Sequence, residues 1–367
     1  MLNTPDFTEF LVSRIDFFAG VPDSLLKDLN ACLMKTLPKN NFWTNVNEGQ
    51  SVAMCVGHYL ATKRPGAVYM QNSGIGNAVN PLLSLADKQV YSIPVLLLTG
   101  WRGEPDTKDE PQHKKQGLVT KSLFDACQIP YRILPQEFEE AKNTVEWAIQ
   151  AMEQNSAPVS LLIRKETFSK FAYEPRAETE FLREAAIETV LEILPEDSII
   201  ISSTGMISRE LYELREKRNE GYNNDFLCIG AMGHASIIAF EIALQKPRQK
   251  VVCLDGDGAM LMHLGALATI GTGEARNFIH IVLNNGTHAS VGGQPTVAVQ
   301  IKATGIAENC GYSKAFLCEN KNELASRLEF ALHNEGRFFI EATVSSKARE
   351  NLGRPKGEPK NWSTRRP

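Results

Sequence analysis

The stretch Val251-Val252-Cys253-Leu254-Asp255-Gly256-Asp257-Gly258 is a short apolar run that ends in a glycine-rich acidic turn. An apolar run of this length, bounded by polar and glycine residues, predicts a buried strand. Gly256 and Gly258 allow a tight turn and let backbone amides approach a phosphate group closely. Asp257, which lies between them, offers a hard oxygen ligand for a metal ion.

A second polar pair follows a second apolar run. A helix-like stretch at about 260–270 separates the turn from the predicted strand 278–283, which ends in Asn284-Asn285. Between the acidic turn and the asparagine pair lie 25 residues. Two parallel strands would bring a carboxylate and an amide oxygen to one edge of a sheet. Mg²⁺ prefers such oxygen ligands and completes its coordination with phosphate and water.

The same residues have an ordinary explanation, because Gly, Asp and Asn are common in turns and at strand ends. The spacing, the two apolar strands and the following loop, His288-Ala289-Ser290-Val291-Gly292-Gly293, argue against it. A dinucleotide site is also disfavoured. The turn lacks a third glycine at the required offset, and no acidic residue ends a second strand about 20 residues later.

Composition limits the possible functions. The chain has 367 residues, 43% of them hydrophobic, which is enough for two domains with proper cores. A net charge of −4 gives no basic footprint for nucleic acid or for an anionic membrane. The seven cysteines are scattered and never spaced Cys-x-x-Cys, so we expect reduced core thiols. With no leader-like N-terminus and no long apolar run, we expect a cytoplasmic protein.

Strand-like and helix-like segments alternate along the chain, which is typical of α/β domains with parallel sheets. We therefore expect two similar domains, each a mainly parallel sheet flanked by helices, with no central third domain. The expected boundaries are 1–164 and 181–350, with a linker at 165–180 and a loosely ordered tail at 351–367. Strands are expected near 17–19, 67–70, 93–98, 158–163, 198–201, 226–229, 251–254, 278–283 and 338–343. Helices are expected at 50–61, 136–153 and 181–194. One further helix should begin at about residue 24, and another should follow Gly76 and run through residue 85.

The acidic turn and the asparagine pair, at this spacing, resemble the signature of thiamine diphosphate enzymes. The resemblance implies that thiamine diphosphate and Mg²⁺ are the cofactors. It implies a two-domain fold whose second domain binds the diphosphate through the residues of the turn and holds the metal. The implied magnesium ligands are Asp257, Asn285 and Thr287, and the implied diphosphate contacts include Gly256, Gly258, Ala259 and Thr204. For Thr204, a plain turn-forming role stays open.

The family also requires one glutamate beside the cofactor's pyrimidine ring. Glu48, within Asn47-Glu48-Gly49, opens the predicted helix 50–61 and resembles that catalytic glutamate. A favourable interaction with the helix dipole would also explain a glutamate here. If it is buried, its pKa should be raised. The helix has an apolar stripe that we expect to face the core, formed by Val52, Ala53, Val56 and Leu60.

Gly230-Ala231-Met232-Gly233 follows a predicted strand and resembles the family loop that wedges between the two cofactor rings. Met232 would be the wedge, and the Gly230 carbonyl would accept a hydrogen bond from the cofactor. The alternative is that Met232 is an ordinary core residue. Because Glu48 and Asp257 lie in different domains, the resemblance implies a homodimer or higher homo-oligomer with active sites at subunit interfaces. The sequence leaves open a contact within one chain.

The two-domain layout resembles, over essentially the whole chain, the decarboxylases that act on phosphonopyruvate or sulfopyruvate. The implied activity is conversion of 3-phosphonopyruvate to phosphonoacetaldehyde and CO₂ in phosphonate biosynthesis. The sulfonate substrate is the nearest alternative. A carboligase of the acetolactate synthase kind would normally carry a third domain. The matching segments are Gly20 to Ser24, Gly100 to Pro105, Asp109 to His113, Ser203 to Gly205, Ser208 to Glu210 and Asn285 to Thr296.

Residues 101–117 form a 17-residue polar stretch without a helical period, which we interpret as a long functional loop. Its basic residues suit a small anionic 2-oxo acid, so Arg102, His113 and Lys114 are candidate substrate contacts. A solvated surface lid is the alternative. His113 is also the candidate proton donor after CO₂ leaves.

Three further residues are candidates. Asp23 is expected either to cap the following helix or, as the resemblance implies, to transfer a proton near the reacting carbon. His288 and Ser290 follow the asparagine pair directly and are candidate substrate contacts.

A function of a different class is also possible, a non-catalytic module that binds phosphate or a nucleotide. In that case Gly256-Asp257-Gly258 and Ser73-Gly74-Ile75-Gly76 would be simple anion-binding loops.

Overall fold

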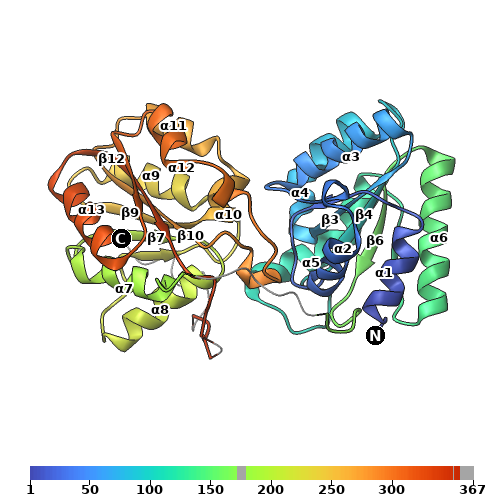
Figure 1. Ribbon diagram of the computed structural model, residues 1–367, viewed down its shortest axis with the longest axis horizontal. Coiled ribbons are helices and arrows are strands. Elements are labelled where there is room, and N and C mark those ends of the chain that lie inside the picture. The colour runs from blue at the N-terminus through green and yellow to red at the C-terminus, as the bar shows by residue number, and fades with distance from the viewer. Residues whose placement is uncertain (172–178, 350, 356–367) are drawn as a thin grey trace. The chain divides into compact units, whose positions relative to one another are not determined.

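A computed structural model describes residues 1–171, 179–349 and 351–355. These residues group into two compact units, divided between positions 175 and 176, except that residues 290–294 group with the first unit. Figure 1 shows the first unit in blue to green and the second in green to red. Each unit contains one six-stranded sheet whose neighbouring strands are all parallel. The expected fold class is confirmed.

The first sheet has the strand order β2-β1-β3-β4-β6-β5. Its strands are β1 (Phe18–Gly20), β2 (Phe42–Thr44), β3 (Gly66–Gln71), β4 (Val95–Gly100), β5 (Tyr131–Ile133) and β6 (Val159–Ile163). The helices of this unit are α1 (Thr4–Val12), α2 (Lys27–Thr36), α3 (Glu48–Thr62), α4 (Ile75–Pro81), α5 (Pro111–Ala126) and α6 (Phe138–Asn155), with 3₁₀ turns at Lys39–Asn41 and Asn72–Gly74 and a π-helical turn at Leu82–Ala86.

Both faces of the first sheet are covered by helices, as parallel sheets require. Alternate residues of β4 point to opposite faces, so Leu96 and Leu98 pack with α1, α2 and α6. Val95 and Leu97 pack with α3, α4 and α5. Figure 1 shows α1 and α6 on one side of the sheet and α3 on the other. The near-continuous apolar character of the strands follows from this double burial.

The second sheet has the order β11-β12-β10-β9-β7-β8. Helices α7, α8 and α13 cover one face, and α9 packs on the other against β9 and β10. The strands are β7 (Ile199–Ser202), β8 (Asp225–Leu227), β9 (Val251–Gly256), β10 (Asn277–Asn284), β11 (Lys314–Cys318) and β12 (Gly336–Thr343). The helices are α7 (Arg183–Ile193), α8 (Met206–Lys217), α9 (Ala235–Gln245), α10 (Asp257–Met262), α11 (Ala266–Thr272), α12 (Ala303–Asn309) and α13 (Lys321–His333), and 3₁₀ turns lie at Ala289–Val291 and Ala298–Gln300.

Several expected elements differ from those observed. The single helix expected at 260–270 is two short helices, because His263 has φ −129° and ψ 51° and ends α10. The helix expected from Ser24 begins at Lys27, and its N-cap is Leu26, so the expected capping role of Asp23 is wrong. The apolar stripe of α3 is also partly wrong, because Ala53 and Leu60 are exposed and Cys55 is buried instead.

The long loop expected at 101–117 is shorter than predicted. Helix α5 begins at Pro111, whose ring occupies the first helical position, where the missing N–H costs nothing. The sequence shows no helical period here because the buried residues of α5 are Gly117, Thr120 and Phe124, two of which are not strongly apolar. His113 therefore lies in the first turn of a helix, while the loop proper spans residues 101–110.

Part of the expected linker 165–180 is bound to the N-terminal segment. The backbone of Leu2 pairs with Thr167 and Ser169, and Thr4 donates a hydrogen bond to the Ser169 carbonyl. Phe168 is buried against Phe7. Residues 172–178 of the expected linker lie outside the described residues. The same is true of position 350, the last of the expected second domain, and of residues 356–367 in the expected tail.

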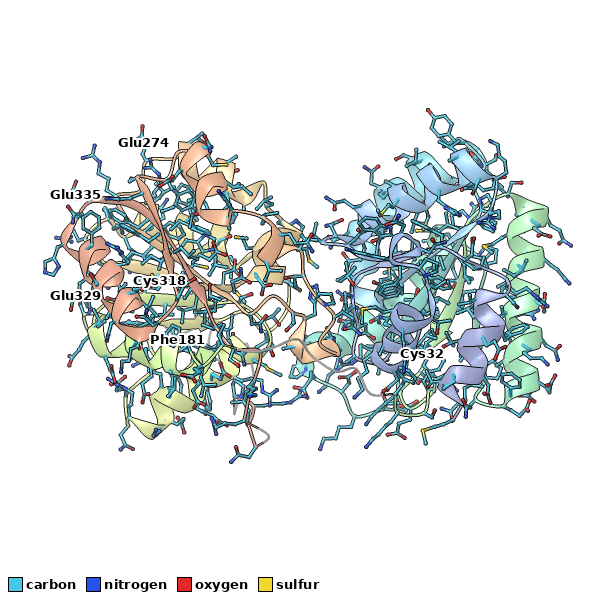
Figure 2. All side chains as sticks on the ribbon, viewed as in Figure 1. Cys32, Phe181, Glu274, Cys318, Glu329 and Glu335 are labelled. Carbon is cyan, nitrogen blue, oxygen red and sulfur yellow. The ribbon has the colours of Figure 1, made fainter. Side chains whose placement is uncertain are left out.

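The seven cysteines are unpaired and lie in buried or half-buried positions. Figure 2 labels Cys32 in the first unit and Cys318 in the second. Burial raises the pKa of the Cys318 thiol to about 12, and Cys55 also has a raised pKa because it is buried. Such thiols are protonated at neutral pH and act as small apolar core residues.

Candidate active site

The topology of the second sheet places the acidic turn where ligands commonly bind. The chain leaves β7 toward β8 on one side and returns to β9 on the other, so β7 and β9 flank a topological switch point. Loops at the carboxyl ends of such strands form a crevice that binds ligands in open α/β sheets. Thr204 follows β7, and Asp257 follows β9. The switch point therefore brings two of the predicted cofactor contacts to the same sheet edge.

Asp257 is buried, with 3% of its surface exposed, at the first position of α10. Its Oδ2 atom accepts a hydrogen bond of 2.5 Å from Thr296 Oγ1, and backbone N–H groups of Gly258 and Asn285 also donate to the carboxylate. Burial nevertheless raises the pKa of Asp257 to about 6. These hydrogen bonds thus only partly offset the cost of burying this carboxylate, and a bound cation would stabilise its charged form.

The two asparagines at the end of β10 face different partners. Asn284 donates a 2.7 Å hydrogen bond to Glu341 on β12 and accepts one from the backbone of Gly286. Asn285 accepts a 3.0 Å bond from the backbone N–H of Thr287. The Thr287 Oγ1 atom is buried and makes no hydrogen bond. An orphaned hydroxyl, an amide oxygen and a buried carboxylate in one loop cluster form a donor set that fits a hard divalent cation.

Two of the predicted site residues, His288 and Met232, lie against Gly258. A Cβ atom at this position would lie 2.9 Å from Cε1 of His288 and 3.4 Å from Cε of Met232. Any larger residue would therefore displace the His288 ring. Burial lowers the pKa of His288 to about 4, so its imidazole is neutral at pH 7. Ala259, which follows Gly258, is buried in α10.

Residues 230–233 form a turn in which two residues have positive φ angles. Ala231 has φ 50° and Gly233 has φ 87°, and the ring of His234 lies 3.2 Å from the Ala231 carbonyl oxygen through Nδ1. Gly230 is half-buried. Thr204 donates a 2.9 Å hydrogen bond to the carbonyl oxygen of Ile229, just before the turn. The Thr204 hydroxyl therefore links the two loops after β7 and β8.

A buried polar cluster lies behind the acidic turn on β9 and β10. His280 contacts Asp255 Oδ2 at 3.3 Å through Nε2 and the Tyr312 hydroxyl at 3.1 Å through Nδ1. Asp255 also accepts a 2.9 Å bond from the backbone N–H of Gly256. Cys253 completes the group, and all three of Cys253, Asp255 and His280 are fully buried. The contact between His280 and Asp255 ties the end of β9 to β10 and so supports the start of the turn.

Glu48, in the first unit, is a buried carboxyl at the start of α3, with 4% of its surface exposed. Its Oε2 accepts a 2.7 Å hydrogen bond from Asn77 Nδ2 on α4. A Cβ atom on Gly74 would lie 2.4 Å from Oε1, so the glycine leaves room for the carboxyl group. Burial raises the pKa of Glu48, and the Asn77 hydrogen bond opposes that shift. This environment suits a carboxyl group that takes up and gives back a proton.

Asp23 is fully buried in the loop after β1. Its Oδ1 accepts a 2.7 Å hydrogen bond from Gln71 Nε2, and its Oδ2 accepts one of 2.9 Å from the backbone N–H of Leu25. Burial raises the pKa of Asp23, while these donors and the charge of Arg102 lower it. The group is held in place by both oxygens.

Arg102 is engaged with other side chains. It forms a two-pronged ion pair with Asp109, at 2.5 and 2.8 Å, and donates a 2.8 Å bond to Ser24 Oγ. The Asn72 side chain donates to the Arg102 carbonyl oxygen. Arg102 therefore organises the loop 101–110, and three of its five donors are already used.

The remaining candidates are more accessible. His113 is half-buried in the first turn of α5, and its carbonyl group packs against the α-carbon of Gly103, where a Cβ would lie 2.0 Å from the His113 oxygen. Lys114 is exposed in the same turn. Ser290 is exposed in the 3₁₀ turn Ala289–Val291. The contacts thus favour Lys114 over Arg102 as the cation available to an anionic substrate.

Sequence reasoning missed several residues that shape these sites. Asn77 and Gly74 define the Glu48 pocket, Thr296 holds Asp257, and Gln71 holds Asp23. Gly74-Ile75-Gly76 was visible only as a turn, and the roles of Asn77 and Thr296 depend on the packing of elements far apart in sequence. The spacing from Gly74 to Asn77, one helical turn, is the one local signal that could have linked them.

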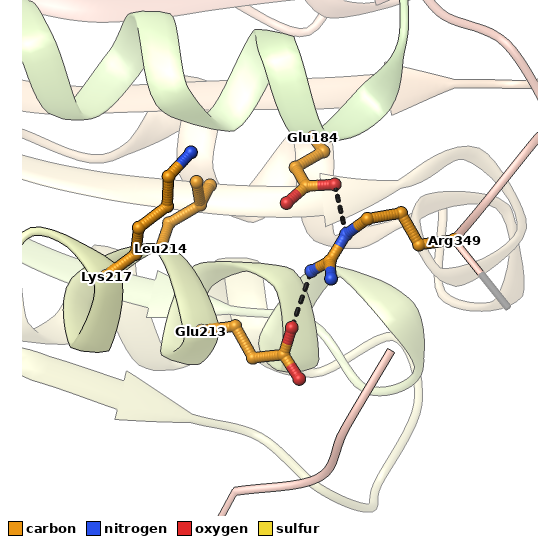
Figure 3. Close-up of a pocket in the computed structure, with 5 residues that line it drawn as sticks. All are labelled: Glu184, Glu213, Leu214, Lys217 and Arg349. Carbon is orange, nitrogen blue, oxygen red and sulfur yellow. Dashed lines mark hydrogen bonds and ion pairs between the residues drawn. The ribbon is translucent and has the colours of Figure 1, made fainter. Parts of the chain in front are cut away.

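A separate pocket on the second unit lies between α7 and α8 (Figure 3). Arg349 crosses it and pairs with Glu184 at 2.7 Å and with Glu213 at 2.5 Å. Lys217 and Leu214 complete its lining. None of these residues belongs to the loops after β7, β9 or β10, so we assign the pocket to the attachment of the C-terminal segment and not to substrate.

Comparison with known proteins agrees with this geometry. Residues 7–124 match the model of the thiamine pyrophosphate enzyme N-terminal TPP binding domain, and residues 201–342 match the C-terminal TPP binding domain. In the described part of the chain every helix is too short or too polar to cross a membrane.

Three curated relatives extend over most of the chain. A phosphonopyruvate decarboxylase from Streptomyces viridochromogenes is 33% identical, with 93% of this chain and 88% of the relative covered. One from Streptomyces hygroscopicus is 34% identical, with 93% and 87% covered. A sulfopyruvate decarboxylase from Methanosarcina acetivorans is 28% identical, with 81% and 79% covered. The chain therefore belongs to the phosphonopyruvate decarboxylase family of thiamine diphosphate-dependent decarboxylases.

Proposed function

We propose that the protein decarboxylates 3-phosphonopyruvate to phosphonoacetaldehyde and CO₂, with thiamine diphosphate and Mg²⁺ as cofactors, in phosphonate biosynthesis. The observation that carries this proposal is the identity of about one third, over 93% of the chain, with two phosphonopyruvate decarboxylases. The sulfopyruvate decarboxylase covers less of the chain at lower identity. A sulfonate in place of the phosphonate is therefore the second candidate.

The second unit would hold the metal and the diphosphate. Asp257, Asn285 and Thr287 would coordinate Mg²⁺, for which the orphaned Thr287 hydroxyl and the buried Asp257 carboxylate are suited. Gly256, Gly258 and Ala259, at the start of α10, would contact the diphosphate, and Thr204 follows the neighbouring strand β7 at the switch point. Met232 and the Gly230 carbonyl would support the pyrimidine ring.

When bound, thiamine diphosphate supplies a carbanion that attacks the ketone and an electron sink for the bond to the departing CO₂. The protein's part is to control protons and charge. Glu48 would hold a proton at the pyrimidine nitrogen, and its raised pKa suits that shared proton. Asn77 keeps the carboxyl group oriented through Oε2.

The product carbon then needs a proton. His113 and Asp23 are the proposed groups that deliver it, because an imidazole is a suitable proton donor and burial raises the pKa of Asp23, which favours its protonated form. His288, neutral and packed against Gly258, would donate a hydrogen bond to the substrate, with Ser290 beside it in sequence.

The substrate carries a carboxylate and a phosphonate, so the site must offer positive charge although the chain as a whole is negative. Lys114 is the candidate for the phosphonate, because it is exposed in the first turn of α5 while Arg102 is paired with Asp109. Arg102 would act on the substrate through its two remaining donors and through the loop that it holds.

We also propose a homodimer or a higher homo-oligomer in which each active site takes Glu48 from one subunit and Asp257 from another. The support is the separation of these two buried carboxyl groups between the N-terminal and C-terminal TPP binding domains.

Purified protein supplied with thiamine diphosphate and Mg²⁺ tests the proposal. CO₂ release is followed with phosphonopyruvate, sulfopyruvate and pyruvate at equal concentrations. We expect the highest kcat/KM for phosphonopyruvate. A higher value for sulfopyruvate would replace the substrate, and no release from any of the three would refute a decarboxylase of this class.

A further inference from the structure

The first sheet has its own topological switch point, between β1 and β3. From β1 the chain moves to β2 on one side and returns to β3 on the other. Asp23 lies in the loop after β1, and Gln71 is the last residue of β3. Loops at such points are where open α/β sheets bind ligands. A buried carboxylate and an amide therefore meet at the position of this sheet best suited to chemistry.

Both oxygens of Asp23 are held. Gln71 Nε2 donates to Oδ1 at 2.7 Å, and the Leu25 backbone N–H donates to Oδ2 at 2.9 Å. Gly100 closes the remaining space, because a Cβ on it would lie 2.2 Å from Oδ2. These contacts leave the carboxylate one position, and Gln71 supplies its side-chain hydrogen bond.

A second hydrogen bond fixes which end of the Gln71 amide faces Asp23. Ser73 Oγ donates to Gln71 Oε1 at 2.7 Å, so the amide nitrogen is turned toward Asp23. Exposure falls along this path, since Ser73 is exposed, Gln71 is half-buried and Asp23 is fully buried. A hydrogen-bonded row thus leads from the surface to the carboxylate.

The Gln71 amide affects the pKa of Asp23. Burial raises the pKa of Asp23, and the Gln71 hydrogen bond is the largest of the effects that lower it. The charged group that acts on Asp23 from the neighbouring loop is Arg102, which is itself paired with Asp109. An N–H donor stabilises a carboxylate more than a carboxylic acid.

We propose that Gln71 is a positioning residue for the decarboxylation, that it keeps Asp23 in one orientation and sets the pH at which Asp23 gains its proton, and that Ser73 orients the Gln71 amide for this task. The inference rests on the proposed role of Asp23 in delivering a proton to the product carbon. Gln71 exchanges no proton itself.

Two variants of Gln71, each with a side chain of similar size, test whether its amide controls the ionisation of Asp23. Gln71→Leu removes the donor, and Gln71→Glu replaces it with a group that repels a charged Asp23. The ionisation of Asp23 is followed by carboxyl ¹³C NMR in cofactor-free protein, with its signal assigned by Asp23→Asn. We expect the midpoint to move to higher pH in both variants and further in Gln71→Glu. Ser73→Ala should cause a smaller shift, and Ser84→Ala, which removes only a hydroxyl bonded to Asn80, should cause none.

Turnover provides the second measurement. With phosphonopyruvate, Gln71→Leu should lower kcat about 10-fold or more with little change in KM, and the limb of the pH profile that Asp23→Asn abolishes should move to higher pH. Thermal unfolding checks that each variant is folded.

An Asp23 midpoint that is unchanged in both Gln71 variants would overturn the proposal. So would a shifted midpoint with an unshifted kcat profile. The NMR measurement needs no catalysis, and wild-type turnover of phosphonopyruvate judges the proposed function separately, so the two failures are distinguishable.

Discussion

Asn77 on α4 donates a 2.7 Å hydrogen bond to Oε2 of Glu48 at the start of α3. The other carboxyl oxygen, Oε1, occupies the space that a side chain at Gly74 would fill. Asn77 thus orients the buried carboxyl group of Glu48 by a hydrogen bond, and Gly74 leaves the space that the other carboxyl oxygen needs. Buried carboxyl groups with raised pKa values are common at catalytic sites, and this pair of contacts defines what Glu48 needs from its surroundings.

Removing the ionisable group should stop catalysis without unfolding the protein. Glu48→Gln keeps the shape of the side chain, and the amide can still meet Asn77. We expect kcat for CO₂ release to fall by roughly 10²- to 10⁴-fold, because a positioned acid–base group is lost. The exposed Glu139→Gln on α6 is the matched control. Near wild-type turnover in Glu48→Gln would remove Glu48 from the mechanism.

Gly74→Ala should displace the Glu48 carboxyl group without unfolding the protein. The new Cβ would lie 2.4 Å from Glu48 Oε1, and the end of a side chain can move aside at little cost. We expect a folded protein whose carboxyl group is displaced, with kcat reduced about 10²-fold, as small misplacements of catalytic groups cause.

Gly76→Ala is a close control for this variant. It lies two residues later in α4, where an added Cβ meets nothing within 4 Å. Alanine favours a helix over glycine by up to about 1 kcal/mol, so this variant should be fully active and slightly more stable. Equal losses of activity in both variants would show that the Glu48 contact is not the cause.

Thr296→Val should weaken metal binding without touching a metal ligand. The Thr296 hydroxyl donates to Asp257 Oδ2, and valine has the same shape without the donor. Partners of metal ligands typically contribute about 10- to 100-fold to metal affinity. We therefore expect the Mg²⁺ concentration for half-maximal cofactor binding, measured by calorimetry, to rise by that factor. Thr272→Val, whose hydroxyl bonds only within α11, should leave the titration unchanged, whereas Asp257→Ala should abolish it.

The sequence predicted those parts of the site that follow from local chemistry. An apolar run that ends in Gly256-Asp257-Gly258 predicts both a buried strand and a tight turn, and the structure has β9 and α10 there. Parallel pairing of β9 with β10, with Gly256 opposite Leu283, then brings Asp257 beside the asparagine pair. Nothing beyond strand adjacency was needed for that step.

Contacts made across elements could not be predicted in the same way. Arg102 carries a charge that suits an anionic substrate, but its fork is filled by Asp109, seven residues later in a loop whose path the sequence does not specify. Helix α5 was missed because a helix with three buried residues of mixed polarity has no apolar period. The partners Asn77, Thr296 and Gln71 are ordinary polar residues until packing places them against a carboxylate.

Asp109→Asn should destabilise the first unit in a way that depends on pH. Partial burial acts to raise the pKa of Asp109, but the Arg102 hydrogen bonds and two backbone N–H groups outweigh it and hold the pKa well below its usual value. A lowered carboxyl pKa contributes stability above the unfolded value near 3.9, and that contribution fades as the pH falls below it. At pH 7 we expect a loss of about 1–3 kcal/mol in the free energy of unfolding.

Urea unfolding of wild type and Asp109→Asn at several pH values checks this. The difference between the two proteins should be largest at neutral pH and should shrink below about pH 4. Asp106→Asn, in the same loop but exposed, is the control and should match wild type throughout. A difference that stays constant from neutral to acidic pH would mean that the ion pair with Arg102 is not the source of the stability.

Mixing two inactive variants tests whether subunits share active sites. Glu48→Gln and Asp257→Ala are each expected to be inactive alone. If every site takes Glu48 from one subunit and Asp257 from another, a mixed dimer has one site with both native residues and one with neither. Random pairing of equal amounts then restores about a quarter of wild-type activity. The two proteins are co-expressed with different tags, and native mass spectrometry confirms mixed oligomers. Mixed oligomers without activity would show that each site draws both carboxyl groups from a single chain, because every chain in the mixture then lacks one of them.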